Sequence, residues 1–277
     1  MKHQSVKSLC RALNASRSAF YRWLKSPISD RKERDIHLKR KILLTYTESH
    51  KIYGYLRIHK SLYYDGEKCG KKRVARLMKE LSICSKIKRK YKVTTNSNHN
   101  KPVAKNLIER DFQPGSPNDV WASDITYIRT REGWLYLAVV MDLFSRKIVG
   151  WSVSNRIDAN LVEEALLKAI KERRPKAGLL FHSDRGAQYA SEKIQNILLN
   201  NDIACSMSRK GDCYDNAVVE SFFNSLKSEW TYHKTYETRI KAKQSLFEYI
   251  EIFYNRSRLH STLGYLSPVS FESCSIN

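Results

Sequence analysis

The feature that most constrains the fold is the change at Pro114-Gly-Ser-Pro117 from a polar, basic stretch to regular strand and helix patterns. This segment marks a domain boundary. After it, three strand-like segments follow one another with only short turns between them, which predicts an antiparallel meander. Strand and helix signals then alternate. Strands are expected at residues 120–129, 133–143, 147–154, 178–182 and 203–207, and helices at 160–171, 191–200, 215–232 and 239–254. The order predicts an α/β fold with a mixed five-stranded sheet flanked by helices.

The part before this boundary is strongly basic. Residues 1–120 hold 29 Lys and Arg against 10 Asp and Glu, whereas residues 121–277 hold 21 and 18. Such a one-sided excess repels itself without a polyanionic partner, and the DNA backbone is the commonest polyanion for a soluble intracellular protein. The charge distribution therefore predicts that the front half binds DNA.

Residues 1–26 have the outline of a helix-turn-helix. Two short amphipathic segments flank the turn at residues 14–16, and Ser16 is a suitable N-cap for the second helix. A plain helical hairpin has the same outline and stays open as an alternative. The residues that the second helix would present to DNA are Arg17, Ser18, Tyr21 and Arg22.

Residues 30–84 contain a second outline of this kind, with helices expected at 36–49, 55–64 and 71–81. The last helix buries an apolar stripe and leaves its basic side chains for phosphates, although an ordinary solvated face is an alternative. The basic residues assigned to DNA are Lys72, Arg73 and Arg76. The polar, basic residues 85–117 are expected to form a linker to an α/β domain at 118–277.

Composition argues against several classes of protein. The longest apolar run, residues 134–144, is interrupted by Asp142 and is too short to span a membrane. The first residues lack the apolar core of a signal peptide, and the six cysteines lack zinc-ligand spacing. We therefore expect a cytoplasmic protein without a membrane partner or a structural zinc ion.

Three carboxylates occupy positions that suit metal ligands. Asp124 lies within an otherwise apolar strand, where a carboxylate is costly unless it is paired or bound to a metal. Asp184 follows the strand at 178–182, at an end where sheet proteins place ligands, and 35 residues separate it from Glu220. Carboxylates that hold two divalent cations would suit cleavage of a phosphodiester. Asp142 also ends an apolar strand and is a competing candidate.

The helix that carries Glu220 has a polar strip. With about 100° per residue, the strip is formed on one side by Asn216, Glu220, Asn224 and Lys227, and apolar residues cover the opposite side. We expect Asn216 and Lys227 to contact DNA near the carboxylates. A solvated lysine or a partner for the helix dipole is an alternative for Lys227.

Four motifs in order resemble a known family. They are Trp121-Ala-Ser-Asp-Ile-Thr-Tyr127, Phe181-His-Ser-Asp-Arg-Gly-Ala-Gln-Tyr189, Cys213-Tyr-Asp-Asn-Ala-Val-Val-Glu-Ser-Phe-Phe223 and Tyr254-Asn-Arg-Ser-Arg-Leu-His-Ser-Thr-Leu-Gly-Tyr-Leu-Ser-Pro268. They resemble the DDE core of retroviral-type integrases and insertion-sequence transposases, and more narrowly the OrfB-type catalytic subunit of a bacterial insertion sequence. Ser18-Ala-Phe-Tyr-Arg-Trp-Leu24 and Tyr53-Gly-Tyr-Leu-Arg-Ile58 extend the resemblance to nearly the whole chain.

The resemblance implies an RNase H-like fold and a DNA transposase. In that scheme Asp124, Asp184 and Glu220 hold two Mg²⁺ or Mn²⁺ ions. Water cleaves the donor strand, and the freed 3′-hydroxyl attacks another phosphodiester. Lys227 would hold DNA beside these carboxylates, and Asp142 would be structural.

The resemblance also implies partners. These are the transposon ends and the target DNA, bound by a homo-oligomer in the nucleoid. Fused members of the family carry an upstream helix-turn-helix and a leucine zipper. No sustained heptad is present here, so we expect an upstream-frame partner or a fused form to assist end recognition. The alternative is a non-catalytic DNA-binding regulator that keeps the fold, which would not need an acid inside the strand at Asp124.

Overall fold

The computed structural model describes residues 5–25, 28–86, 114–208 and 217–275, and its contacts divide the chain into two compact units. The first unit, Met1–Ser85, is helical in its described part, and the second, Lys86–Asn277, contains the sheet. None of the helices in these ranges is both long enough and apolar enough to cross a membrane.

The first unit contains two groups of helices. In one group, α1 (Val6–Ala12) contacts α2 (Arg17–Lys25), and in the other, α3 (Asp30–Glu48), α4 (Tyr55–Tyr64) and α5 (Lys71–Glu80) pack on one another. The second group has its own apolar core, formed by Leu38, Ile42, Ile58, Leu62, Val74 and Leu77. Helix α2 buries none of its side chains, so the α3–α5 group is the one stabilised by a hydrophobic core.

Helix α3 begins earlier than the sequence pattern predicts. The Oγ of Ser29 accepts a hydrogen bond from the backbone N–H of Lys32, and Asp30 and Glu33 lie in the first turn. An N-cap and acidic residues in the first turn both stabilise a helix start. The predicted start at residue 36 is therefore wrong, because the polar first two turns hide the helix from an apolar pattern.

The second unit is built on one five-stranded sheet with the order β3-β2-β1-β4-β5. Its strands are β1 (Val120–Thr130), β2 (Gly133–Asp142), β3 (Ile148–Ser154), β4 (Leu180–Ser183) and β5 (Ala204–Met207). The first three pair antiparallel, as the predicted meander requires, whereas β4 pairs parallel with both β1 and β5. The prediction of an α/β fold with a mixed sheet is confirmed.

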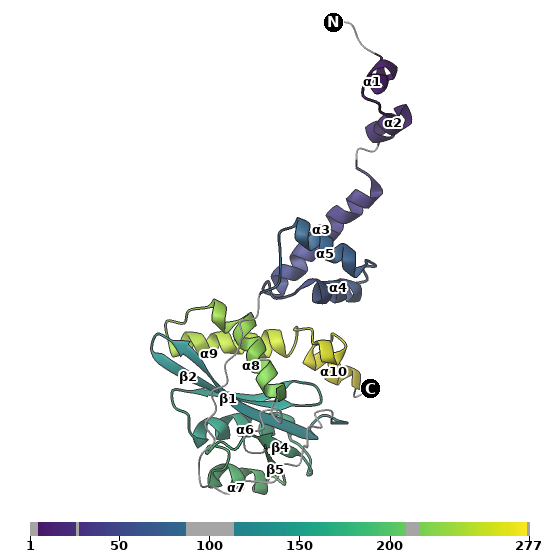
Figure 1. Cartoon of the computed structure of the whole chain (residues 1–277). Coiled ribbons are helices and arrows are strands. Elements are labelled where there is room, and N and C mark those ends of the chain that lie inside the picture. The colour runs from purple at the N-terminus through teal and green to yellow at the C-terminus, as the bar shows by residue number, and fades with distance from the viewer. Residues whose placement is uncertain (1–4, 26–27, 87–113, 209–216, 276–277) are drawn as a thin grey trace. The chain divides into compact units, whose positions relative to one another are not determined.

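Helices cover both faces of this sheet (Figure 1). Helices α6 (Ala159–Arg173) and α7 (Glu192–Asn200) lie on one face, and α8 (Ala217–Glu229) and α9 (Arg239–Phe247) lie on the other. Buried apolar residues of the sheet and of α6 and α7 form one continuous core. At Gly150 a Cβ atom would collide with the carbonyl oxygen of Ala165, so glycine permits the close approach of β3 and α6.

The last part of the chain wraps back onto the sheet. A single helix was predicted for residues 239–254, but α9 continues instead into a π-helix, η3 (Glu248–Tyr254), whose buried side chains include Tyr249 and Tyr254. The other short elements are the 3-10 helices η2 (Thr231–His233) and η4 (Ser261–Leu263) and the helix α10 (Pro268–Ser275).

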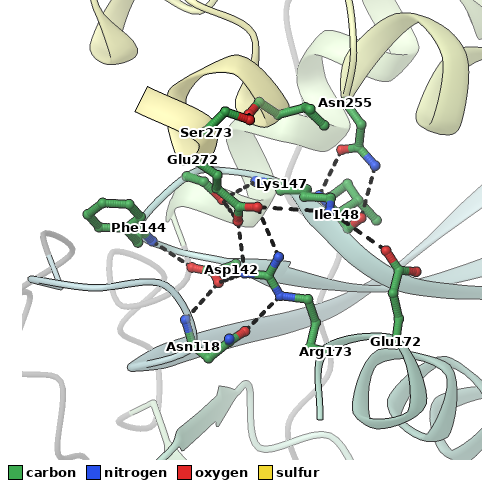
Figure 2. A network of polar contacts seen from close by, with 12 residues as sticks. Asn118, Asp142, Phe144, Lys147, Ile148, Glu172, Arg173, Asn255, Glu272 and Ser273 are labelled. Carbon is green, nitrogen blue, oxygen red and sulfur yellow. Dashed lines mark hydrogen bonds and ion pairs between the residues drawn. The ribbon is translucent and has the colours of Figure 1, made fainter. Parts of the chain in front are cut away.

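A buried ionic network fixes α10 to the sheet (Figure 2). The guanidinium of Arg173 lies 3.0 Å from Asp142 Oδ2 and 2.9 Å from Glu272 Oε1, and so joins α6 to the end of β2 and to α10. The backbone N–H groups of Asn118 and Phe144 also donate to Asp142, each at 2.9 Å. The hydrogen bonds of Asp142 are thus used to join elements, as expected for a structural carboxylate.

Candidate active site

Strand pairing brings Asp124 and Asp184 next to each other. In the parallel pair of β1 and β4, the last register partners are Ser123 and Ser183. The next residue of each strand is an aspartate, and neighbouring strands lie about 4.8 Å apart. The two carboxylates that the sequence places far apart are therefore neighbours at the carboxyl end of β4.

The sheet becomes one strand pair narrower beyond these residues. Strand β4 ends at Ser183, whereas β1 continues to Thr130 with only β2 beside it in the ladder. Both Asp124 and Asp184 keep part of their surface accessible to solvent. The carboxylates thus lie where the pairing of β1 with β4 ends, each with part of its surface exposed.

The negative charges of these carboxylates repel one another. Burial raises the pKa of Asp124 well above its ordinary value, and the carboxylates of Asp184 and Glu220 raise it further. The backbone N–H of Ile125 donates to Asp124 Oδ1 at 2.7 Å and opposes this rise in pKa. A site that concentrates negative charge against its own electrostatics is typical of a functional site, since a bound cation would relieve the repulsion.

The turn after β4 holds the Asp184 side chain. The backbone N–H of Gly186 donates to Asp184 Oδ1 at 2.9 Å, and Arg185 Nε donates to the carbonyl oxygen of Ser208 at 2.6 Å. A Cβ atom at Gly186 would lie 2.9 Å from Asp184 Oδ1, closer than such atoms normally approach. The Asp-Arg-Gly sequence therefore provides both the carboxylate and the space that it needs.

A buried tyrosine, Tyr189, lies close enough to the two aspartates to interact with their charges. Its hydroxyl is 2.9 Å from Ser123 Oγ, and because Ser123 gives its one proton to the carbonyl oxygen of Val139, Tyr189 donates to Ser123. Burial raises the pKa of Tyr189 well above its ordinary value, and the charges of Asp124 and Asp184 add to the rise. Tyr189 was not among the predicted site residues, although it ends the second of the four motifs.

Glu220 comes from the opposite layer, on the first turn of α8. It is partly buried, and this burial raises the pKa of its carboxyl group. Its charge acts on Asp124, but within the described ranges no three acidic, histidine or cysteine side chains are grouped closely enough to hold a metal ion. Asp124 and Asp184 thus follow paired strand positions, and Glu220 acts on Asp124 from α8 through its charge.

Lys227 lies further along α8 and is only 7% exposed. Its Nζ lies 4.8 Å from the centroid of the Tyr127 ring. Burial lowers the pKa of Lys227, while the carboxylate of Asp124 acts to raise it. Its burial argues against the solvated lysine that the helical spacing left open.

A buried ion pair holds α8 in place. Arg258 donates from Nη2 to Glu229 Oε1 at 2.7 Å and from Nε to Oε2 at 2.8 Å, and the Tyr249 hydroxyl donates to Oε2 at 3.0 Å. Burial alone would lower the pKa of Arg258, but the adjacent Glu229 carboxylate raises it above its ordinary value. These contacts join α8 to the π-helix and to the last of the four motifs.

The predicted DNA contacts fall into three groups. The four on α2, which are Arg17, Ser18, Tyr21 and Arg22, are exposed, as is Lys72 on α5. Arg73 and Arg76 instead pair with the two carboxylate oxygens of Asp35 on α3, each at 2.8 Å. Asn216 lies outside the described residues.

Comparisons with known proteins agree with this architecture. Residues 114–213 and 220–276 each match a family described as "Integrase core domain", and residues 32–91 match "HTH-like domain". "Insertion element IS600 uncharacterized 31 kDa protein" of Shigella sonnei is 45% identical over 264 residues, which are 95% of this chain and 97% of the relative. "Transposase InsF for insertion sequence IS3A" of Escherichia coli (strain K12) is 42% identical over 277 residues, with coverages of 98% and 96%.

The chain belongs to the IS3-family transposases. The predicted resemblance to an OrfB-type transposase with an integrase core is confirmed, and so is a helix-turn-helix-like region in the front half of this transposase. A chain of the "simian T-cell lymphotropic virus intasome in complex with PP2A regulatory subunit B56 gamma" matches with a TM-score of 0.50 at 15% identity, covering 83% of this chain and 74% of that chain. This likeness confirms the integrase-like fold.

Proposed function

We propose that this IS3-family transposase cleaves donor DNA and transfers the strand in a metal-dependent reaction that uses Asp124, Asp184 and Glu220. The observation that carries the proposal is that Asp124 and Asp184 follow the last register pair of β1 and β4 and are both partly exposed. Membership of a transposase family supports the reaction class. The acid within the apolar strand at Asp124 favours an enzyme over a regulator that only binds DNA.

The carboxylates fit a divalent cation by their chemistry. Oxygen donors suit Mg²⁺ or Mn²⁺, and a cation would relieve the repulsion that raises the pKa of Asp124. Asp124 and Asp184 would hold the ions, with Glu220 as the third ligand. Two bound ions would supply charge stabilisation for the attacking and leaving oxygens of the phosphodiester.

Other residues of the chain would contribute to DNA binding. Lys227, whose Nζ lies 4.8 Å from the Tyr127 ring and whose charge interacts with that of Asp124, would offer a positive charge to a phosphate beside the carboxylates. The pKa of Tyr189 lies well above its ordinary value, so its phenol adds no negative charge near the two aspartates. The exposed basic face of α2, together with the front-half charge, would bind transposon ends, and the protein would act as a homo-oligomer on end and target DNA.

Strand cleavage by the full-length protein tests this proposal. We expect the parent to nick duplex DNA that carries the terminal repeats of its element in Mg²⁺, and EDTA to abolish nicking. Asp184→Asn and Glu220→Gln should each lower the rate by on the order of a hundredfold or more while end binding persists. The matched control is Asp202→Asn, because Asp202 is exposed with a φ of 53° that asparagine tolerates, and it should cleave like the parent.

Two results would count against the proposal. If Asp184→Asn and Glu220→Gln nicked DNA as fast as the parent, the assignment of these carboxylates would be wrong. If every form bound the ends and none cleaved them, the non-catalytic regulator would be the better description.

A further inference from the structure

Two large aromatic side chains lie together on the surface of the second unit. Tyr127 on β1 and Trp134 on β2 form a T-shaped pair with ring centroids 5.0 Å apart and an interplanar angle of 81°. Trp134 is opposite Arg129 in the ladder and Tyr127 is opposite Tyr136, so the two rings are diagonal neighbours on one face. Tyr127 is 41% exposed and Trp134 is 47% exposed, which leaves much of both rings in contact with solvent.

This pair is linked to the candidate active site through Lys227, although alternation along β1 directs the side chains of Asp124 and Tyr127 to opposite faces of the sheet. Tyr127 follows Asp124 by three residues, or about 10 Å of extended strand. Lys227 connects the two, because its Nζ lies over the Tyr127 ring and its charge interacts with Asp124. The pairing of β1 with β4 has already ended at Ser123, so β4 does not cover this stretch. A DNA strand whose phosphate meets the carboxylates would reach the aromatic pair past Lys227, along the edge of β1 that β4 leaves unpaired.

The surroundings of the pair are suited to a nucleic acid. Arg129 is exposed directly opposite Trp134, and Arg239 Nε donates to the backbone carbonyl oxygen of Trp134 at 3.2 Å. Arg131, 69% exposed at its side chain, lies 2.9 Å from Glu237. Basic side chains beside exposed aromatic faces are the combination with which proteins bind single-stranded nucleic acid.

We propose that Tyr127 and Trp134 form a stacking platform for an unpaired DNA base near the phosphodiester that reacts. The proposal rests on the proposed function, since it places the reacting phosphate at Asp124 and Asp184. An aromatic face compensates an unpaired base for its lost stacking whatever the base, so such a platform would hold a base that has left the duplex. Lys227 would then bind the backbone between the platform and the carboxylates.

Photo-crosslinking tests the contact directly. The full-length protein is mixed, in EDTA to prevent cleavage, with a terminal-repeat duplex that has three unpaired nucleotides at the reacting end. 5-Iodouracil replaces each of these nucleotides in turn, and the cross-linked peptide is identified by mass spectrometry. We expect at least one position to cross-link to Tyr127 or Trp134, and cross-links confined to other residues would overturn the platform.

Affinity measurements with matched variants test the energetics. We expect the parent to bind the duplex with the unpaired end more tightly than a fully paired one, and Tyr127→Leu or Trp134→Leu to reduce this preference by about five- to a hundredfold. Tyr127→Phe and Trp134→Phe keep an aromatic face and should keep the preference. Unchanged preference in the leucine variants would show that the pair only stabilises the sheet, and this would overturn the inference.

These measurements separate the platform from the cleavage reaction. Cross-linking and affinity are read without metal, so a cleavage-inactive protein that still stacks the base would refute the proposed function and leave the platform intact. Conversely, Mg²⁺-dependent cleavage by a protein without any preference for the unpaired end would refute the platform alone.

Discussion

Single residues in the turn after β4 set the position of a carboxylate. Asp184 Oδ1 accepts a hydrogen bond from the backbone N–H of Gly186. The φ of Gly186 does not lie in the left-handed region, so the backbone alone would accept another residue. The requirement for glycine comes from the space that the carboxylate occupies, which connects this position to the chemistry of the site.

Gly186→Ala should therefore impair the reaction more than the fold. The new Cβ would lie 2.9 Å from Asp184 Oδ1 and 3.0 Å from Gln188 Oε1, so the carboxylate would have to move. A shift of about 1 Å in a reacting group costs on the order of a hundredfold in rate, and we expect a loss of this order in Mg²⁺-dependent nicking. Gly115→Ala is the control, because its nearest neighbour would lie 3.9 Å away. Parent-like nicking by Gly186→Ala would show that the turn does not position Asp184.

The sequence was sufficient to select a residue when its immediate neighbours in the chain make its charge unusual. Asp124 could be selected because it interrupts an apolar strand, and Asp184 because it follows one. The buried contact of Tyr189 with Ser123 and the ion pairs of Asp35 could not be predicted, because each depends on side chains brought together by packing. The burial of Lys227 was missed for the same reason, since helical spacing does not show how closely a polar strip is covered.

At the level of elements, α8 carries two proposed site residues and needs a fixed position. The buried Glu229–Arg258 pair joins the end of α8 to the segment after the π-helix, and the Tyr249 hydroxyl completes its hydrogen bonds. Within the described residues both partners are almost fully buried, with side-chain exposures of 7% and 4%. Removing one partner would leave the other as an unpaired charge in the interior, which is costly.

Arg258→Met should reduce the free energy of unfolding by about 3–5 kcal/mol, because Glu229 loses its partner. The double variant Glu229→Gln with Arg258→Met should recover much of this loss, since no buried charge is left unpaired. Chemical denaturation of the parent, both single variants and the double variant measures the coupling. Arg256→Met serves as the control, because Arg256 is exposed and its removal should change stability by less than about 0.5 kcal/mol. Equal losses in the single and double variants would show that the two residues are not coupled.

The order of helices and strands along the chain could be predicted from the sequence, whereas the pairing of strands in the sheet could be predicted only in part. Strand alternation and helical periodicity predicted the meander and the succession of helices and strands. The placement of β4 beside β1 depends on a long connection through α6, which local patterns do not encode. The π-helix η3 was expected as an ordinary helix, because a change in backbone hydrogen bonding leaves the hydrophobic spacing of a short segment almost unaltered.

At the scale of the whole molecule, the excess positive charge and the proposed metal ligands lie in different parts of the sequence. The excess of Lys and Arg lies in residues 1–120, and the three proposed metal ligands lie in the second unit. The two compact units have separate internal contacts, so their contributions to DNA binding can be measured separately. Affinity for phosphates depends on salt through the counterions that binding releases, and this dependence counts the contacts made by each unit.

Removal of residues 1–85 should therefore flatten the salt dependence of DNA binding. The logarithm of the association constant falls against the logarithm of salt concentration with a slope of about −0.9 for each phosphate contact. Arg17→Gln, Arg22→Gln and Lys72→Gln in the full chain should each remove about 0.9 from this slope if the residue meets a phosphate. Arg76 also pairs with Asp35, so part of the effect of Arg76→Gln should appear as lower stability of the α3–α5 group. An unchanged slope in the shortened protein, with its sheet unit still folded by circular dichroism, would show that the basic residues of 1–85 do not bind DNA.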